Sequence, residues 1–173
     1  MEEGLHLLHR RVHPLLERVE VQGGGLANFT SDDVTLFSAG TLGGTIIAED
    51  HMEFPEAGME SVRLVQASQW FFQHLRLADE VFLKINCEGC EVWIIPDLVK
   101  SGSMKTVTWA MIDFDARKRA ATKDLEPELR RMVERYDGHW ADQQIMNGPP
   151  THQLRIRQWL CKKPEYFPNV CNS

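Results

Sequence analysis

The clearest hydrophobic pattern in the chain lies between residues 80 and 98. Residues 81–85 form an apolar run interrupted only by Lys84, which predicts a strand covered on both faces, as central parallel strands are. The next four residues, from Asn86 to Gly89, predict a turn, because Gly89 can adopt a positive φ without a Cβ clash. Apolar residues then recur at helical spacing through residues 92–99, which predicts a helix containing Pro96.

A second long apolar strand is predicted over residues 106–114. Two carboxylates, Asp113 and Asp115, lie at its carboxyl end. A strand, a helix and another strand in this order predict a parallel crossover with the two strands side by side. We therefore expect Asn86, Glu88 and these two aspartates to face one cleft, where the aspartates are candidates for a general base, a cation ligand or an anionic turn before a helix.

Weaker patterns place the remaining elements. Residues 4–19 and 125–136 have amphipathic helical spacing, and a further helix is expected to start at a Ser68 cap. Gly23, Gly24 and Gly25 follow a predicted strand and could cradle a ligand. The other expected strands are residues 18–22, 33–37, 45–48, 61–67 and 153–160, and residues 139–151 are expected to form a polar loop.

Composition narrows the class of protein. The 173 residues predict one domain, residues 1–173, and 43% hydrophobic with 25% charged residues is typical of globular chains. The formal net charge of -6 argues against a general nucleic-acid or anionic-membrane binder. No apolar run approaches the ~20 residues that span a bilayer, and the first residues lack the features of a signal peptide, so a cytoplasmic protein is expected.

The four cysteines allow three interpretations. Cys87 and Cys90 form a CxxC, whereas Cys161 and Cys171 are separated by nine residues and form no second CxxC. A zinc site and a redox pair at the start of a helix are two of the interpretations. The third is that the cysteines are small, semi-buried residues beside a glycine turn, and no metal ligand is assigned.

The run L-K-I-N-C-E-G-C-E, residues 83–91, resembles the L-K-I-D-x-E-G-x-E signature of FkbM-type S-adenosylmethionine-dependent methyltransferases. Glu88, Gly89 and Glu91 fit it, as do Lys84 and Ile85, while Asn86 replaces the usual acid. The resemblance implies an α/β fold of the Rossmann-like class I methyltransferase type, with a partly parallel sheet flanked by helices. It also implies O- or N-methyl transfer from S-adenosylmethionine to an unknown acceptor, such as a small molecule.

The resemblance assigns cofactor-binding roles to particular positions. Gly24 and Gly25 would lie near the adenosine. Asn86 and Glu88 would lie near the methionine end or the acceptor, and Gly89 completes the predicted cofactor-binding set. The predicted catalytic residues are Glu88, Asp113 and Asp115.

Two features of that family are missing from this sequence. It has neither the glycine-rich loop after the first strand nor the acid that ends the second strand, so the resemblance implies a domain truncated at its N-terminus, whose activity as this chain is doubtful. The strands near residues 20 and 83 would then lose the neighbours that separate them. Either they pair directly, or another chain, such as a second copy, covers an exposed edge. A non-catalytic interaction module and a CxxC redox or zinc protein are the alternative functions.

Overall fold

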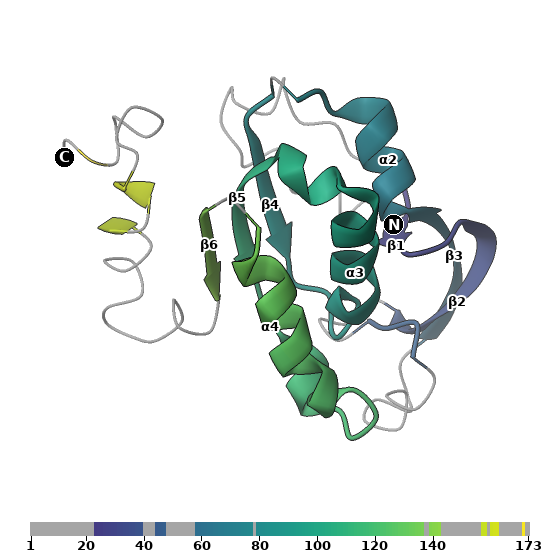
Figure 1. Ribbon diagram of the computed structural model, residues 1–173. Helices are drawn as coiled ribbons and strands as arrows, with labels where there is room; N and C mark the ends of the chain where they lie inside the picture. Colours follow the sequence, from purple (N-terminus) through teal and green to yellow (C-terminus); the bar gives the residue numbers. More distant parts are fainter. Residues whose placement is uncertain are drawn as a thin grey trace.

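The computed structural model describes residues 23–39, 44–47, 58–77, 79–136, 139–142, 157–158, 160–162 and 171. In this part of the chain the fold is α/β, with two three-stranded sheets and three α-helices (Figure 1). The predicted helix at residues 4–19 and the predicted strand at residues 18–22 lie outside the described residues. The interpretation of residues 1–173 as one domain stays a prediction.

The first sheet has the order β1-β3-β2. Strand β1 (Gly25–Ala27) runs parallel to β3 (Gly58–Gln66), which pairs with β2 (Ser31–Ala39) in antiparallel fashion. The strands predicted at residues 33–37 and 61–67 are therefore confirmed. Of the strand predicted at residues 45–48, the described part contributes one isolated bridge, between Thr45 and Phe37.

The second sheet is entirely parallel and has the order β4-β5-β6. Strand β4 (Val81–Ile85) pairs with β5 (Val107–Ile112), which confirms the predicted parallel neighbours. Strand β6 (His139–Asp142) shows that one prediction is wrong, because these residues were predicted to form a loop. A second correction concerns the end of the chain, where residues 157, 158 and 160 are helical and not part of a strand.

The prediction that β4 is covered on both faces is wrong. Phe82 is 47% exposed and Lys84 is also exposed, whereas Ile85 is buried, so one face of this strand is open to solvent. Strand β5 has the two-sided burial expected of a central strand, with Trp109 on one side and Ala110 on the other, both buried. The difference follows from position, because β4 is the outer strand of its sheet and β5 the middle one.

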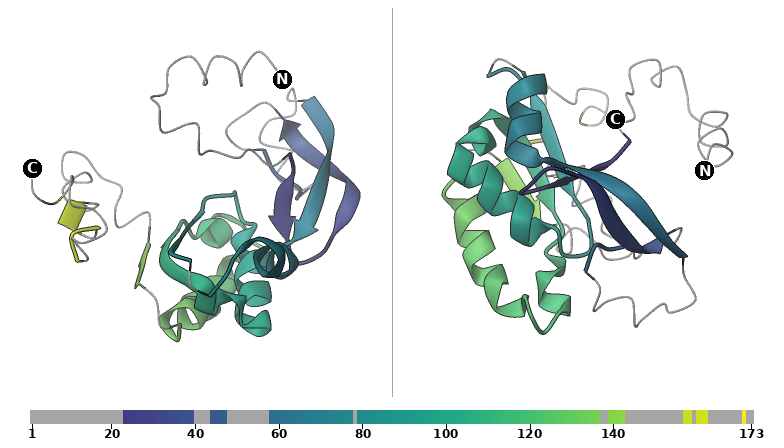
Figure 2. Two further views of the ribbon diagram at one scale, coloured as in Figure 1. Left: turned by 90° about the horizontal axis from the view of Figure 1, so that it is seen from above. Right: turned by 90° about the vertical axis from the view of Figure 1, so that its right-hand side faces the viewer.

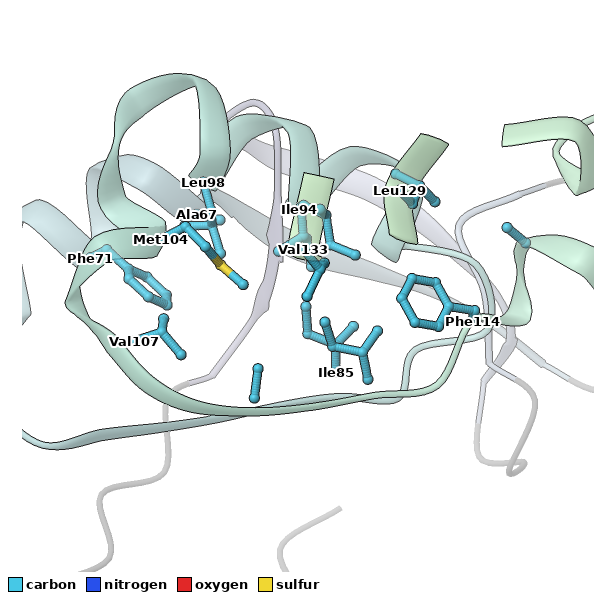
Figure 3. Packing of buried hydrophobic residues seen from close by; sticks show 14 residues of the cluster. Ala67, Phe71, Ile85, Ile94, Leu98, Met104, Val107, Phe114, Leu129 and Val133 are labelled. Carbon is cyan, nitrogen blue, oxygen red and sulfur yellow. The ribbon is translucent and has the colours of Figure 1, made fainter. Parts of the chain in front are cut away.

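Three helices pack over the second sheet and complete the core: α2 (Ala67–His74), α3 (Glu91–Ser101) and α4 (Glu126–Glu134). Figure 1 shows α3 and α4 in front of β4 and β5. Their apolar side chains meet those of the strands in one layer (Figure 3). Each large apolar side chain buried there contributes roughly 1.5–3 kcal/mol. The buried cluster comprises Ala67, Phe71, Ile85, Ile94, Ile95, Leu98, Met104, Val107, Ala110, Ile112, Phe114, Ala116, Leu129 and Val133.

Polar contacts fix the helices relative to their neighbours. Asp97 of α3 accepts a hydrogen bond of 2.7 Å from the backbone N–H of Ser68 in α2, and another of 2.8 Å from the Gln66 side chain. The predicted Ser68 cap is therefore wrong, because Ser68 lies inside α2 and Asp97 of α3 caps this helix. Arg130 of α4 donates to Asp142 of β6 at 2.5 Å and lies 4.4 Å from the centre of the Phe114 ring, so it ties α4 to the edge of the sheet.

Candidate functional site

A cleft of about 720 Å³ lies where the two sheets approach each other. Strands β1 and β4 are each the outer strand of their sheet, and both contribute to its wall. Figure 1 shows α3 between them, and the views in Figure 2 show the two sheets meeting at this point. The lining residues come from the three strands of the first sheet, the two glycines before β1, β4 and the turn after it, the start of α3 and the segment at residues 44–46. The cleft therefore occupies the carboxyl end of a parallel strand, where open α/β sheets bind their ligands.

The predicted glycines form one wall of this cleft. Gly24 has a φ of 143°, and a Cβ there would lie 2.8 Å from the Arg63 carbonyl oxygen. A Cβ on Gly25 would lie 2.9 Å from Leu64 Cδ2. The positive φ and the close approach to the β3 backbone thus explain Gly24, whereas Gly25 meets only the flexible end of the Leu64 side chain. Both glycines line the cleft.

The turn after β4 forms the opposite wall. Asn86 and Glu88 both line the cleft, as predicted. Glu88 has a φ of 48°, which is uncommon for a residue with a side chain and costs of order 1 kcal/mol. Gly89 follows with a φ of 98°.

Gly89 has a structural role that the sequence did not reveal. It is buried, and it is not part of the cleft lining. A Cβ there would lie only 1.8 Å from Nη1 of Arg119, so the guanidinium group of Arg119 fills the space over this glycine. Gly89 is therefore required for the packing of Arg119 against the turn.

The three predicted catalytic carboxylates lie near one another, although only one reaches the cleft. The ends of β4 and β5 lie side by side, since the Asp113 N–H donates to the Ile85 carbonyl at 2.9 Å. Glu88 and Asp115 share Lys118, whose Nζ lies 3.4 Å and 2.7 Å from them. Glu88 lines the cleft, whereas Asp113 and Asp115 do not.

The two aspartates differ in their surroundings. Asp115 is 1% exposed, and its Oδ2 has no hydrogen-bond partner within the described residues. Its hydrogen bond to Lys118 raises the pKa of that lysine. Burial, and then the charge of Asp115, raise the pKa of Asp113, which also pairs with Arg117 at 3.3 Å. These contacts form an ionic network outside the cleft lining, in which the aspartates are buried and Lys118 is half-exposed.

Sequence reasoning missed two residues at this turn. Glu91 is fully buried, burial raises the pKa of its carboxyl group, and one carboxyl oxygen accepts a hydrogen bond from the Ala116 N–H. Trp93 contributes an aromatic side chain to the cleft. The final glutamate of the motif was a visible signal for Glu91, whereas no pattern distinguished Trp93 from other apolar helix positions.

The cysteines pair as two disulfides, Cys87–Cys90 and Cys161–Cys171. In this state none of the four offers a thiolate to zinc, and the described residues contain no group of three or more His, Cys, Asp or Glu side chains that could hold a metal ion. Disulfides are commoner in oxidising compartments than in the cytoplasm. The cytoplasmic location therefore stays a prediction.

Within the described part of the chain, no helix has the length and apolar character needed to cross a bilayer. Comparison with known proteins gives no family assignment, since no family model, no curated protein and no solved structure matches this chain significantly.

Proposed function

We propose that the chain is an S-adenosylmethionine-dependent methyltransferase-like domain of the Rossmann-like class I type. One observation carries this proposal: Gly24 and Gly25 line the same cleft as Asn86 and Glu88, although the two stretches lie far apart in the sequence. The resemblance assigned both stretches to the cofactor. The cleft volume of about 720 Å³ is in the range typical of small-molecule sites.

The lining suits the parts of such a cofactor. Trp93, Leu26 and Ile94 provide apolar surface for a base, and the Asn86 amide provides a donor and an acceptor. The Glu88 carboxylate is an anion that would favour a nearby sulfonium cation. The Lys118 ammonium group lies 3.4 Å from the Glu88 carboxylate and restricts its position.

Methyl transfer by in-line displacement depends chiefly on positioning the acceptor against the methyl group. A base is needed when the acceptor is a hydroxyl. Of the three predicted catalytic carboxylates, Glu88 is the one on the cleft wall. In this proposal Glu88 contacts the bound molecules, while Asp113 and Asp115 act through the position of Lys118 and the turn.

Calorimetric titration with S-adenosylmethionine and S-adenosylhomocysteine tests the proposal. We expect binding by the wild type and about tenfold or weaker binding by Asn86→Ala and Glu88→Gln, which each lose a polar contact of roughly 1.4 kcal/mol. Glu134→Gln is the matched control, because Glu134 is an exposed acid of α4 outside the cleft. Absence of binding by the wild type at millimolar cofactor contradicts the proposal.

The second candidate is a non-catalytic interaction module. The observation that favours it is that β1 and β4 are both outer strands of their sheets within the described part of the chain. Outer strands present unpaired N–H and C=O groups that can add a strand from another chain. A protein that binds no cofactor but associates with itself would support this candidate over methyl transfer.

A further inference from the structure

We propose that the Cys87–Cys90 disulfide is a thiol–disulfide exchange site for a small cysteine-containing thiol that enters the cleft. This site is independent of methyl transfer, because it needs the cleft and the two sulfur atoms but no methyl donor.

The position of this disulfide distinguishes it from a purely structural crosslink. It spans a separation of three residues, within the turn between β4 and α3. Both of its cysteines are half-buried and both line the cleft. The Cys161–Cys171 disulfide spans ten residues and contributes neither cysteine to the cleft. A thiol bound in the cleft therefore meets the first disulfide and not the second.

The surroundings of Cys90 favour its release as a thiolate. Cys90 is the N-cap residue of α3, an eleven-residue helix, so it lies at the positive end of the helix dipole, although its side chain makes no capping hydrogen bond. The Arg119 guanidinium group lies against Gly89, the neighbouring residue. Two acids, whose negative charge opposes a thiolate, also flank this turn, but each has a partner of its own. Glu88 is paired with Lys118, and a carboxyl oxygen of Glu91 is hydrogen-bonded to the Ala116 N–H.

The exchange proceeds in two balanced steps. The thiolate of the small thiol attacks Cys87 Sγ, the bond between the two cysteines breaks, and Cys90 leaves as a thiolate while a mixed disulfide forms on Cys87. A second thiolate then attacks the sulfur of the small thiol in this mixed disulfide and releases Cys87. In sum, two small thiols are oxidised to one disulfide, and their two electrons and two protons reduce Cys87–Cys90 to two thiols. The reverse reaction reforms the bond.

The direct test uses the wild-type protein in glutathione buffers of increasing reducing strength. Differential alkylation and peptide mass spectrometry then report the two disulfides separately. We expect Cys87–Cys90 to open at a reduced-glutathione concentration at least about tenfold lower than Cys161–Cys171. Opening of both bonds at the same concentration, or resistance of Cys87–Cys90 after the other has opened, would overturn the proposal. Glutathione is the probe, and cysteine and coenzyme A in parallel samples define how large a thiol the cleft admits.

Variants test the assigned direction of attack. Cys90→Ser should retain one glutathione on Cys87 after treatment with oxidised glutathione. In Cys87→Ser, the alkylation rate of Cys90 should rise at lower pH than that of a free cysteine, and adding Arg119→Gln should move this profile to higher pH. Adding Lys123→Gln should leave it unchanged, since Lys123 is an exposed cation of a neighbouring turn. An identical pH profile of Cys90 alkylation with and without Arg119→Gln would show that Arg119 does not favour the Cys90 thiolate. Far-UV circular dichroism checks the fold of each variant, and the wild-type titration needs no variant.

A protein that binds no S-adenosylmethionine can still pass this test. Failure here likewise leaves the cofactor titration unaffected, so the two proposals fail separately.

Discussion

The Glu91 carboxylate, at the first residue of α3, accepts a hydrogen bond from the backbone N–H of Ala116, at the start of the short helix η4 (Asp115–Lys118). This contact links the turn after β4 to the turn after β5. The first turn lines the cleft, and the second carries Lys118, which contacts Glu88 of the first. The buried Glu91 side chain therefore fixes the position of Lys118 relative to the cleft.

Glu91→Ala and Glu91→Gln should have different effects on stability. The alanine variant removes the acceptor of the Ala116 N–H and should lower the free energy of unfolding by about 1–3 kcal/mol. The glutamine variant keeps a carbonyl acceptor and removes the ionisable group. Urea unfolding of both variants at several pH values measures the difference.

The pH dependence of this comparison has a definite sign. Burial raises the pKa of Glu91 above its ordinary value of 4.5, so the folded chain holds this proton more tightly than the unfolded chain. The wild type should therefore lose stability relative to Glu91→Gln as the pH rises through and above 4.5. A glutamine variant that becomes relatively less stable as the pH rises would show that ionised Glu91 is favoured in the fold, with the backbone N–H groups of Glu91 and Ala116, and then the charge of Arg119, as the causes.

The cap that α3 provides to α2 should be measurable in the same way. Asp97→Ala leaves the Ser68 N–H and the Gln66 side chain without their acceptor and should cost about 1–2 kcal/mol of unfolding free energy. Asp97→Asn keeps one acceptor and should cost less. Asp124→Ala, at an exposed aspartate before α4, is the control. Equal stability of the alanine variants at positions 97 and 124 would show that the cap contributes nothing.

Sequence patterns predicted the elements whose stability is local. The strand at residues 81–85 is a dense apolar run, and α4 has a clear amphipathic period, so each was visible in its own residues. Strand β6 was not visible, because His139–Asp142 is short and contains two polar residues. Its strand conformation depends on pairing with Trp109 to Ile112 of β5. Long-range pairing of this kind leaves little trace in a short segment.

In the candidate site, too, local patterns predicted some residues, whereas contacts between distant parts of the chain could not be predicted. Asn86 and Glu88 were found because they follow a strand inside a recognisable motif, and both line the cleft. The contact of Arg119 with Gly89 was not found, because it joins residues thirty positions apart through the packing of two turns. For the same reason the sequence could not separate Glu88, on the cleft wall, from Asp115, which is buried behind it.

Lys118 should be required for the stability of this region. Lys118→Met leaves the buried Asp115 without its cation and should lower the free energy of unfolding by about 1–3 kcal/mol at neutral pH. Asp115→Asn in the same chain should recover part of the loss, because the unmatched charge is gone. A double-mutant cycle from urea unfolding gives the coupling energy. Lys123→Met controls for the loss of an exposed lysine, and additive effects at positions 118 and 115 would contradict the pairing.

Tyr136 should ionise at a higher pH than an ordinary tyrosine. Burial raises the pKa of Tyr136 to about 12, and its hydroxyl has no hydrogen-bond partner within the described residues. The folded chain should therefore lose stability as the pH rises from 10.0 toward about 12, since the unfolded chain releases this proton more readily. Tyrosinate absorbance during an alkaline titration measures the pKa. Of the two tyrosines in the chain, Tyr136→Phe should remove this late step. A wild type with both tyrosines titrating near 10.0 would contradict the assignment.

The position of β4 as an outer strand among the described strands gives the prediction on self-association. If a second copy covers this edge, the contact should include Phe82, a β4 side chain that is 47% exposed. Phe82→Lys should then weaken the dimer by about tenfold or more, because a charge at the edge opposes strand addition. Phe72→Lys is the matched control, since Phe72 is an 87% exposed phenylalanine on α2, away from the edge.

Light scattering over a range of concentrations measures the association. A wild type that stays monomeric throughout contradicts the homo-oligomer, and a dimer broken by Phe72→Lys but not by Phe82→Lys moves the interface from β4 to α2. Either result would argue against strand addition at β4.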